Sequence, residues 1–139
     1  MTATSRHTFD HWRQSAADLT FPSGLVIDGR STPAADAATF DHIGPREGTL
    51  LTTVPAGSTA DLDLAIAAAR AAFDGGPWPT MPPRERKRLM LRWADLIEEH
   101  RDELALLVSL EMGKPVEEAW SIELRAVLAT DRRYAELAD

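Results

Sequence analysis

The side chains that most often perform chemistry in proteins are few and scattered along this sequence. Its 139 residues include no cysteine, so they offer no thiolate nucleophile, no thiolate metal ligand and no disulfide. The four histidines, His7, His11, His42 and His100, are scattered, and only His7 and His11 have the i, i+4 spacing of a helical metal site, with no third ligand near them. We therefore expect both histidines to be exposed polar residues of a terminal tail.

Three further patterns are better explained as structure than as functional sites. Gly75-Gly76 lacks the flanking residues of a phosphate-binding loop and follows a helical pattern, so it predicts a helix end. The basic cluster at 84–88 is interrupted by Glu85 in an acidic chain, which favours a solvated helix face over a phosphate or nucleic-acid site. The glutamates at 98–123 include no pair that the sequence selects for general acid–base catalysis.

The composition indicates a soluble, globular chain of about one domain. Hydrophobic residues make up 44% and charged residues 27% of the sequence, which argues against a disordered protein. The formal charge of −7 argues against nucleic acid and against an anionic membrane surface as partners. No apolar run approaches the roughly 18–20 residues of a transmembrane helix, and the N-terminus lacks the apolar core of a secretory signal. A cytoplasmic location is the expectation.

The elements that would position any site begin with a short amphipathic helix at 9–19. The run Leu25–Ile27, followed by Asp28-Gly29, predicts a tight turn and a β-hairpin with Arg30–Thr32 as the return strand. A further strand candidate follows at 49–54. The N-terminal part of the chain is therefore expected to contain the β structure.

Four helical patterns follow the strands. The first begins at a capping box at 58–61, the second begins at the proline pair 82–83, and the third ends at Gly113, where Pro115 prevents continuation. The fourth extends over 116–137. The residues expected on buried stripes are Leu62, Ala65, Ile66, Ala69, Phe73, Leu89, Trp93, Leu96, Ile97, Leu104, Leu107, Val108, Leu110, Trp120, Leu124, Val127 and Leu128. The residues alone predict a helix-rich domain with a small β portion and no active site.

Several segments, in order and at characteristic spacings, match the pattern of a known family. They are the strand and turn at 25–29, the segment 39–48, the strand 50–57, the run Asp61–Phe73 with Trp78, Arg86 with Leu89, Ala94–Ile97, Leu110–Pro115 and Arg132–Ala135. Together they resemble the N-terminal part of the aldehyde dehydrogenase superfamily, over residues 20–139, and the LEMGKP run at 110–115 is the most characteristic. His11–Gln14 is similar to a bacterial subgroup that oxidises γ-glutamyl-γ-aminobutyraldehyde and related amino-aldehydes.

The resemblance implies NAD(P)-dependent oxidation of an aldehyde to a carboxylate. In that mechanism a cysteine thiolate attacks the carbonyl, hydride passes to the nicotinamide, and a glutamate-activated water hydrolyses the thioester. The family's oxyanion-binding asparagine, cofactor loop, glutamate and cysteine all follow the part matched here. We therefore expect no catalytic residue and no NAD- or NADP-binding residue in this chain, no bound cofactor, and no aldehyde oxidation by the chain alone.

The resemblance also implies roles for four residues. Many family members bind a structural monovalent cation through a carbonyl and a carboxylate, at positions that correspond to Ile43 and Glu111. A helix of the family contributes to the substrate tunnel at positions that correspond to Ile122 and Ala126. The remaining cation ligand and the opposite tunnel wall lie beyond the matched part, so packing and helix termination also explain these four residues.

Two departures from the family pattern fall in the last predicted helix. Asp131 stands where the family generally has a large apolar residue, and Arg133 stands where it often has an aromatic one. A buried acid lowers stability unless it is solvated or paired. We therefore expect this helix either to be exposed at Asp131 or to be no longer selected for packing.

The expected fold is a helix-rich α/β fragment with an N-terminal β-hairpin and a short strand followed by about four helices. It would belong to a larger Rossmann-type NAD-binding domain. Residues 1–20 would form a tail with a short helix, and residues 21–139 the N-terminal part of an aldehyde dehydrogenase domain, truncated before the cofactor and catalytic motifs. Two functions fit: a truncated aldehyde dehydrogenase that is inactive alone, or a non-catalytic helical module that binds a full-length dehydrogenase or another partner.

Overall fold

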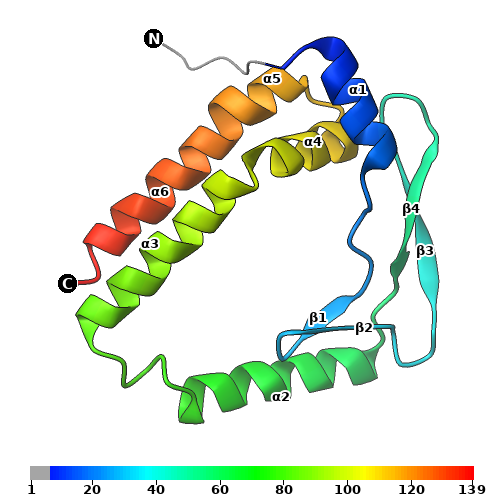
Figure 1. Ribbon diagram of the computed structural model, residues 1–139. Helices are drawn as coiled ribbons and strands as arrows, with labels where there is room; N and C mark the ends of the chain where they lie inside the picture. The colour runs from blue at the N-terminus through cyan, green and yellow to red at the C-terminus, as the bar shows by residue number, and fades with distance from the viewer. Residues whose placement is uncertain (1–6) are drawn as a thin grey trace. The chain divides into compact units, whose positions relative to one another are not determined.

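The computed structural model describes residues 7–139, which divide into two compact units (Figure 1). The helical unit contains residues 7–20, 44–47 and 82–139, and the hairpin unit contains residues 21–43 and 48–81. Helices make up most of the described chain, together with two small antiparallel sheets. This architecture confirms the expected helix-rich α/β fragment.

The first sheet is the predicted hairpin of β1 (Leu25–Ile27) and β2 (Arg30–Thr32). The two residues that join its strands, Asp28 and Gly29, have φ angles of 52° and 71°. Two successive positive φ angles define a type I′ turn, whose twist matches that of paired antiparallel strands. The Asp-Gly pair therefore determines both the position and the register of this hairpin.

The second sheet pairs β3 (Thr39–Ile43) with β4 (Leu50–Pro55). The sequence predicts β4, whereas its partner β3 was not expected as a strand. Most of β3 is exposed, and Asp41 and His42 interrupt any apolar alternation, so its pairing rather than its composition defines it as a strand. The register shifts between His42 and Ile43, at the end of β3.

The helix α2 (Thr59–Gly75) begins and ends as predicted. The Ser58 hydroxyl accepts the backbone N–H of Asp61 and the Asp61 carboxylate accepts the backbone N–H of Ser58, which completes a capping box. Its apolar residues are nevertheless on the surface, because Leu62 and Ile66 are each 57% exposed and Phe73 is 67% exposed. The expectation that these three residues are buried is wrong within the described residues.

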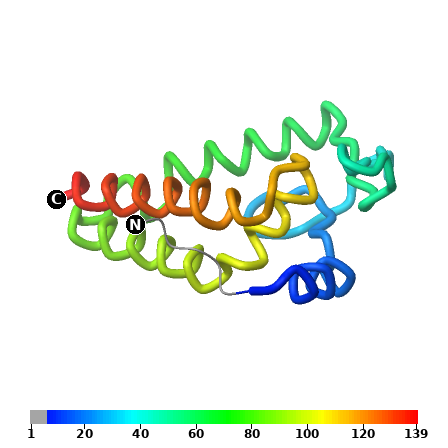
Figure 2. Tube along the Cα trace, turned by 90° about the horizontal axis from the view of Figure 1, so that it is seen from above, coloured from blue at the N-terminus to red at the C-terminus, as the bar shows by residue number. Residues whose placement is uncertain are grey.

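The helical unit begins with α1 (Phe9–Asp18), which the Thr8 hydroxyl caps by accepting the N–H of His11. It continues with α3 (Pro83–Glu99), α4 (Arg101–Met112), α5 (Val116–Glu118), a π-helical segment η1 (Ala119–Glu123) and α6 (Leu124–Glu136). Figures 1 and 2 both show α6 running alongside α3. Trp12 of α1 is buried. The long helix predicted at 116–137 is therefore present, with a π-helical turn inside it.

The core of the helical unit lies where α4 meets the chain after Pro115. Ala105, Ala119 and Leu124 form the buried cluster, and Leu104, Val108, Val116 and Trp120 pack against it. The helices α3 and α6 contact each other. On α3, Ala94 is fully buried, whereas Trp93 is 61% exposed. The predicted burial of Leu89, Trp93 and Val127 is thus wrong, because all three side chains are exposed. No helix within residues 7–139 is both long and apolar enough to span a membrane.

Candidate functional site

The most family-specific stretch, LEMGKP at 110–115, forms a tightly specified helix stop. The Ser109 hydroxyl donates to the Lys114 carbonyl at 2.6 Å, and the Gly113 N–H donates to the Ser109 carbonyl at 2.9 Å. Gly113 has φ of 71°, and a Cβ atom there would lie 3.3 Å from Cγ of Pro45. Glycine therefore satisfies two demands at this position, the left-handed conformation and the close approach of Pro45.

Lys114 connects this stop to the next helical segment through an ion pair with Glu123. Glu123 is the last residue of η1. This ion pair therefore connects the π-helical segment to the helix stop at 110–115, which we call the signature turn. The carboxylate of Glu111, by contrast, is exposed on the last turn of α4. The hydrogen bonds and the ion pair described above, which stabilise this turn, do not involve the carboxylate of Glu111.

The two residues that the resemblance relates to a cation lie in different units. Ile43 ends β3 in the hairpin unit and is about half exposed, and Glu111 belongs to α4 of the helical unit. Carbonyl and carboxylate oxygens are suitable ligands for a hard cation. Among residues 7–139, however, no group of three or more His, Cys, Asp or Glu side chains is arranged to hold a metal ion.

The two residues related to the substrate tunnel lie on the exposed surface of the helical unit. Ile122 belongs to η1 and Ala126 to the first turn of α6, and both are exposed. Positions four residues apart in a helix are surface neighbours, so the two side chains share one face. The opposite face holds the buried residues Leu124 and Leu128.

An aromatic and charged cluster links α1, α4 and η1, and sequence reasoning did not find it. Asp102 accepts the indole N–H of Trp120 at 2.7 Å, and its other oxygen lies 2.7 Å from Nε2 of His7. The rings of His7 and His11 stack with centroids 3.9 Å apart. Both histidines are exposed, as predicted, but a sequence separation of 95 residues from His7 to Asp102 offers no pattern to recognise.

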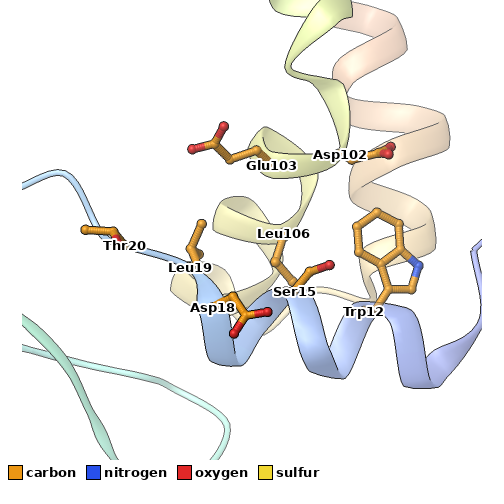
Figure 3. A pocket seen from close by; sticks show the side chains of 8 residues that line it. All are labelled: Trp12, Ser15, Asp18, Leu19, Thr20, Asp102, Glu103 and Leu106. Atoms are coloured by element: carbon orange, nitrogen blue, oxygen red, sulfur yellow. The ribbon is translucent and has the colours of Figure 1, made fainter.

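An open cleft of about 470 Å³ lies between α1 and α4. Figure 3 shows the side chains that line it. The side chains of Ser15 and Asp18 come from α1, and those of Asp102 and Glu103 come from α4. Three carboxylates and two hydroxyls line this cleft, and its lining residues include no histidine or lysine that could activate Ser15 as a nucleophile. The cleft does not assemble a catalytic constellation.

The basic cluster at 84–88 takes part in ion pairs within the helical unit. Nζ of Lys87 lies 2.8 Å from Glu136 and 2.9 Å from Asp139, and Arg88 pairs with Glu85 at 2.9 Å. Hydrogen bonds from Lys87 to Glu136, and then to Asp139, raise the pKa of its ammonium above the ordinary value of 10.5. Lys87 and Arg88 of this cluster are thus paired with acidic side chains of the same unit.

Comparison with known proteins places these features in a family. The aldehyde dehydrogenase family model matches residues 32–139. The mitochondrial benzaldehyde dehydrogenase of Antirrhinum majus is 44% identical over 115 residues, which cover 83% of this chain and 22% of that protein. The NADP/NAD-dependent aldehyde dehydrogenase PuuC of Escherichia coli is 35% identical over 133 residues, covering 96% of this chain and 27% of that protein.

A solved structure matches nearly the whole chain. The γ-glutamyl-γ-aminobutyraldehyde dehydrogenase of Burkholderia cenocepacia superposes with a TM-score of 0.93 and 39% identity, over 96% of this chain and 27% of that one. The chain belongs to the aldehyde dehydrogenase family. It spans about a quarter of the length of these relatives, and it resembles the γ-glutamyl-γ-aminobutyraldehyde dehydrogenases.

Proposed function

We propose that this chain is the N-terminal part of an NAD- or NADP-dependent aldehyde dehydrogenase and is inactive without the rest of that fold. Residues 21–139 would belong to the cofactor-binding domain, and residues 1–20 would precede it as a tail with a short helix. The main support is the match to the Burkholderia cenocepacia enzyme, with a TM-score of 0.93 over 96% of this chain. The reaction would be the oxidation of an aldehyde to a carboxylate.

The composition of the chain supports its dependence on residues outside it. It contains no cysteine, so the thiolate that attacks the aldehyde in this family has to come from elsewhere. NAD or NADP, when bound to the complete fold, would accept the hydride. The residues of this chain would line part of the substrate tunnel and help to position the other residues of the fold, but they would supply no nucleophile.

The proposed substrate class is an amino-aldehyde of the γ-glutamyl-γ-aminobutyraldehyde type. This proposal rests on the structural relative that the chain resembles over nearly its whole length. The apolar side chains of Ile122 and Ala126 would then contact the aliphatic part of the aldehyde and exclude water from it. The Ile43 carbonyl and the Glu111 carboxylate would contribute two ligands to a monovalent cation.

The test joins this chain to the part of the Burkholderia cenocepacia enzyme that follows the matched segment. The purified chimera is expected to reduce NAD+ or NADP+ with γ-glutamyl-γ-aminobutyraldehyde, followed as absorbance of the reduced nicotinamide. A chimera in which alanine replaces the catalytic cysteine of the Burkholderia part is the matched control and should be inactive. A folded chimera without activity would overturn the proposal.

The exposed face of α2 favours a second candidate function, a non-catalytic module that binds an intact dehydrogenase. Leu62, Ile66 and Phe73 present large apolar side chains to solvent, as a binding helix would. A tagged chain should then capture the intact Burkholderia enzyme, and Ile66→Asp should abolish capture. Asp63→Asn changes an exposed polar position of the same helix and is the control that should leave capture unchanged.

A further inference from the structure

The helix that follows Pro115 changes its hydrogen-bonding pattern between Ala119 and Glu123. The N–H of Leu124 donates to the Ala119 carbonyl, five residues earlier, and the segment η1 is a π-helix. Regular α-helix precedes it in α5 and continues after it in α6. Single π-helical turns of this kind accommodate one extra residue inside an α-helix and are frequent at functional sites.

The extra residue keeps two core residues on the same face of the helix. Ala119 and Leu124 both belong to the buried cluster that packs against Ala105 of α4. In an uninterrupted α-helix, side chains five positions apart diverge by about 140°, so one of the two would leave the core. The i→i+5 bond brings them into line, and Leu128 and Ala135 then continue the buried face along α6.

The π-helical turn removes the ordinary donor from the Trp120 carbonyl, and Arg101 replaces it. In an α-helix the Leu124 N–H would donate to the Trp120 carbonyl, but here it donates to the Ala119 carbonyl instead. Arg101 donates to the Trp120 carbonyl from Nη2 at 2.8 Å and from Nε at 3.2 Å. A guanidinium offers these donors as a rigid fork that a lysine lacks.

The side chain of Arg101 is itself held in place. Its guanidinium carbon lies 3.8 Å from the centroid of the Trp120 ring, and Nη1 donates to Glu98 at 3.0 Å. The side chain is only 14% exposed. At the other end of η1, Glu123 pairs with Lys114 of the signature turn. Both ends of the π-helical turn are thus connected to α4 or to the helix stop that follows it.

We propose that Arg101 is a positioning residue that, together with Lys114, maintains the π-helical turn and so sets which face of the helix presents Ile122 and Ala126. If the turn relaxed to an α-helix, the residues after it would rotate by about 100° relative to α4. The orientation of the helix follows from the contacts of this chain alone. Its consequence for contact with an aldehyde rests on the function proposed above.

Amide hydrogen exchange on the 139-residue chain tests the role of Arg101. Arg101→Met should accelerate exchange of the amides of residues 120–125 by about 10-fold or more, because the Trp120 carbonyl loses both donors. Trp120→Phe removes the indole N–H but keeps the carbonyl and an aromatic face, so it should change the same rates less than about 3-fold. Acceleration by Trp120→Phe equal to that of Arg101→Met would overturn the proposal.

Deletion of Ile122 supplies a second, independent comparison. It places the original Ala119 and Leu124 four residues apart, which an ordinary α-helix accommodates on one face. In this background Arg101→Met should accelerate exchange less than about 3-fold, and an undiminished effect would contradict the proposal. Where the deleted chain does not fold, the Arg101→Met and Trp120→Phe comparison decides. These rates do not depend on aldehyde oxidation, so an inactive chimera would leave them unaffected.

Discussion

The Asp61 carboxylate accepts the backbone N–H of Ala35 at 3.0 Å, across 26 residues of sequence. This bond joins the first turn of α2 to the loop after β2, within the hairpin unit. The same carboxylate accepts the Ser58 hydroxyl at 2.7 Å and the Ser58 N–H at 2.8 Å, and Asp61 is only 6% exposed. One acid therefore caps the helix and anchors the preceding hairpin.

Removal of this charge should change how the hairpin unit responds to acid. Hydrogen bonds from the Ser58 hydroxyl, then from the N–H groups of Ser58 and Ala35, lower the pKa of Asp61 below its ordinary value of 3.8. The carboxylate consequently stabilises the folded unit at pH values above 3.8, and this contribution disappears as the pH falls through the lower folded pKa.

We expect Asp61→Asn to lower the melting temperature of the hairpin unit by about 5 °C at pH 7. The difference from the unaltered chain should shrink as the pH falls from 4 toward 2, because the unaltered chain then also loses its charged cap. Thermal unfolding by circular dichroism over this pH series provides the measurement. Asp63→Asn, at an exposed position of the same helix, should show no such pH dependence. An equal effect of both substitutions would contradict the special role of Asp61.

Gly113→Ala should destabilise the helical unit through the signature turn. The left-handed conformation disfavours a Cβ by about 1–2 kcal/mol, and the added atom would also press on Pro45. Urea unfolding should show this loss. Gly29→Ala is the control, because Gly29 has the same φ of 71° and no atom within 4 Å of the Cβ that alanine would add. Equal losses for the two variants would mean that Pro45 does not constrain the turn.

Asp131→Leu, in α6, should stabilise the helical unit. Asp131 is half-buried, and its Oδ2 atom is shielded from solvent without a hydrogen-bond partner within residues 7–139. Replacing an unsatisfied buried oxygen by apolar atoms should raise the free energy of unfolding by about 1–2 kcal/mol. Asp131→Asn removes the charge but keeps the polar group, so it should gain less. Loss of stability in Asp131→Leu would show that the carboxylate is favourable where it stands.

The ion pairs of Lys87 with Glu136 and Asp139 should stabilise the end of α6, and this stabilisation should disappear at high pH. Its folded pKa is raised above 10.5 by Glu136 and then Asp139, so the stabilising contribution is present below 10.5 and disappears as the pH rises through the folded value. Lys87→Gln should therefore increase amide exchange in the last turn of α6 at pH 7. Arg84→Gln, at an exposed position of the same helix, should not.

Local signals in the sequence predicted much of the fold correctly. The Asp28-Gly29 turn, the Ser58–Asp61 capping box and the Gly113 stop each depend on neighbours within a few residues, so their chemistry is readable from sequence. The strand β3 could not be predicted from the sequence, because it is defined by its pairing with β4 and not by its own composition. The π-helical turn was also missed, since the side chain that donates to its Trp120 carbonyl, Arg101, lies 19 residues earlier in the sequence.

The burial of helix faces was the least predictable feature. Apolar periodicity correctly placed Leu124 and Leu128 in the core, but it also placed Leu62, Ile66 and Trp93 there. Periodicity reports that a face is apolar and does not report whether a partner covers it within the same stretch of chain. The candidate tunnel residues Ile122 and Ala126 and the candidate cation ligands Ile43 and Glu111 came from family resemblance alone, and their roles stay predictions.

The most direct test of the proposed function is nicotinamide reduction by this chain with and without the rest of an aldehyde dehydrogenase. With γ-glutamyl-γ-aminobutyraldehyde and NAD+ or NADP+, the 139-residue chain alone should give no absorbance change above that of buffer. The chimera completed with the Burkholderia cenocepacia sequence should turn over the same aldehyde. Turnover by the cysteine-free chain alone, or a folded chimera that stays inactive, would contradict the proposed function.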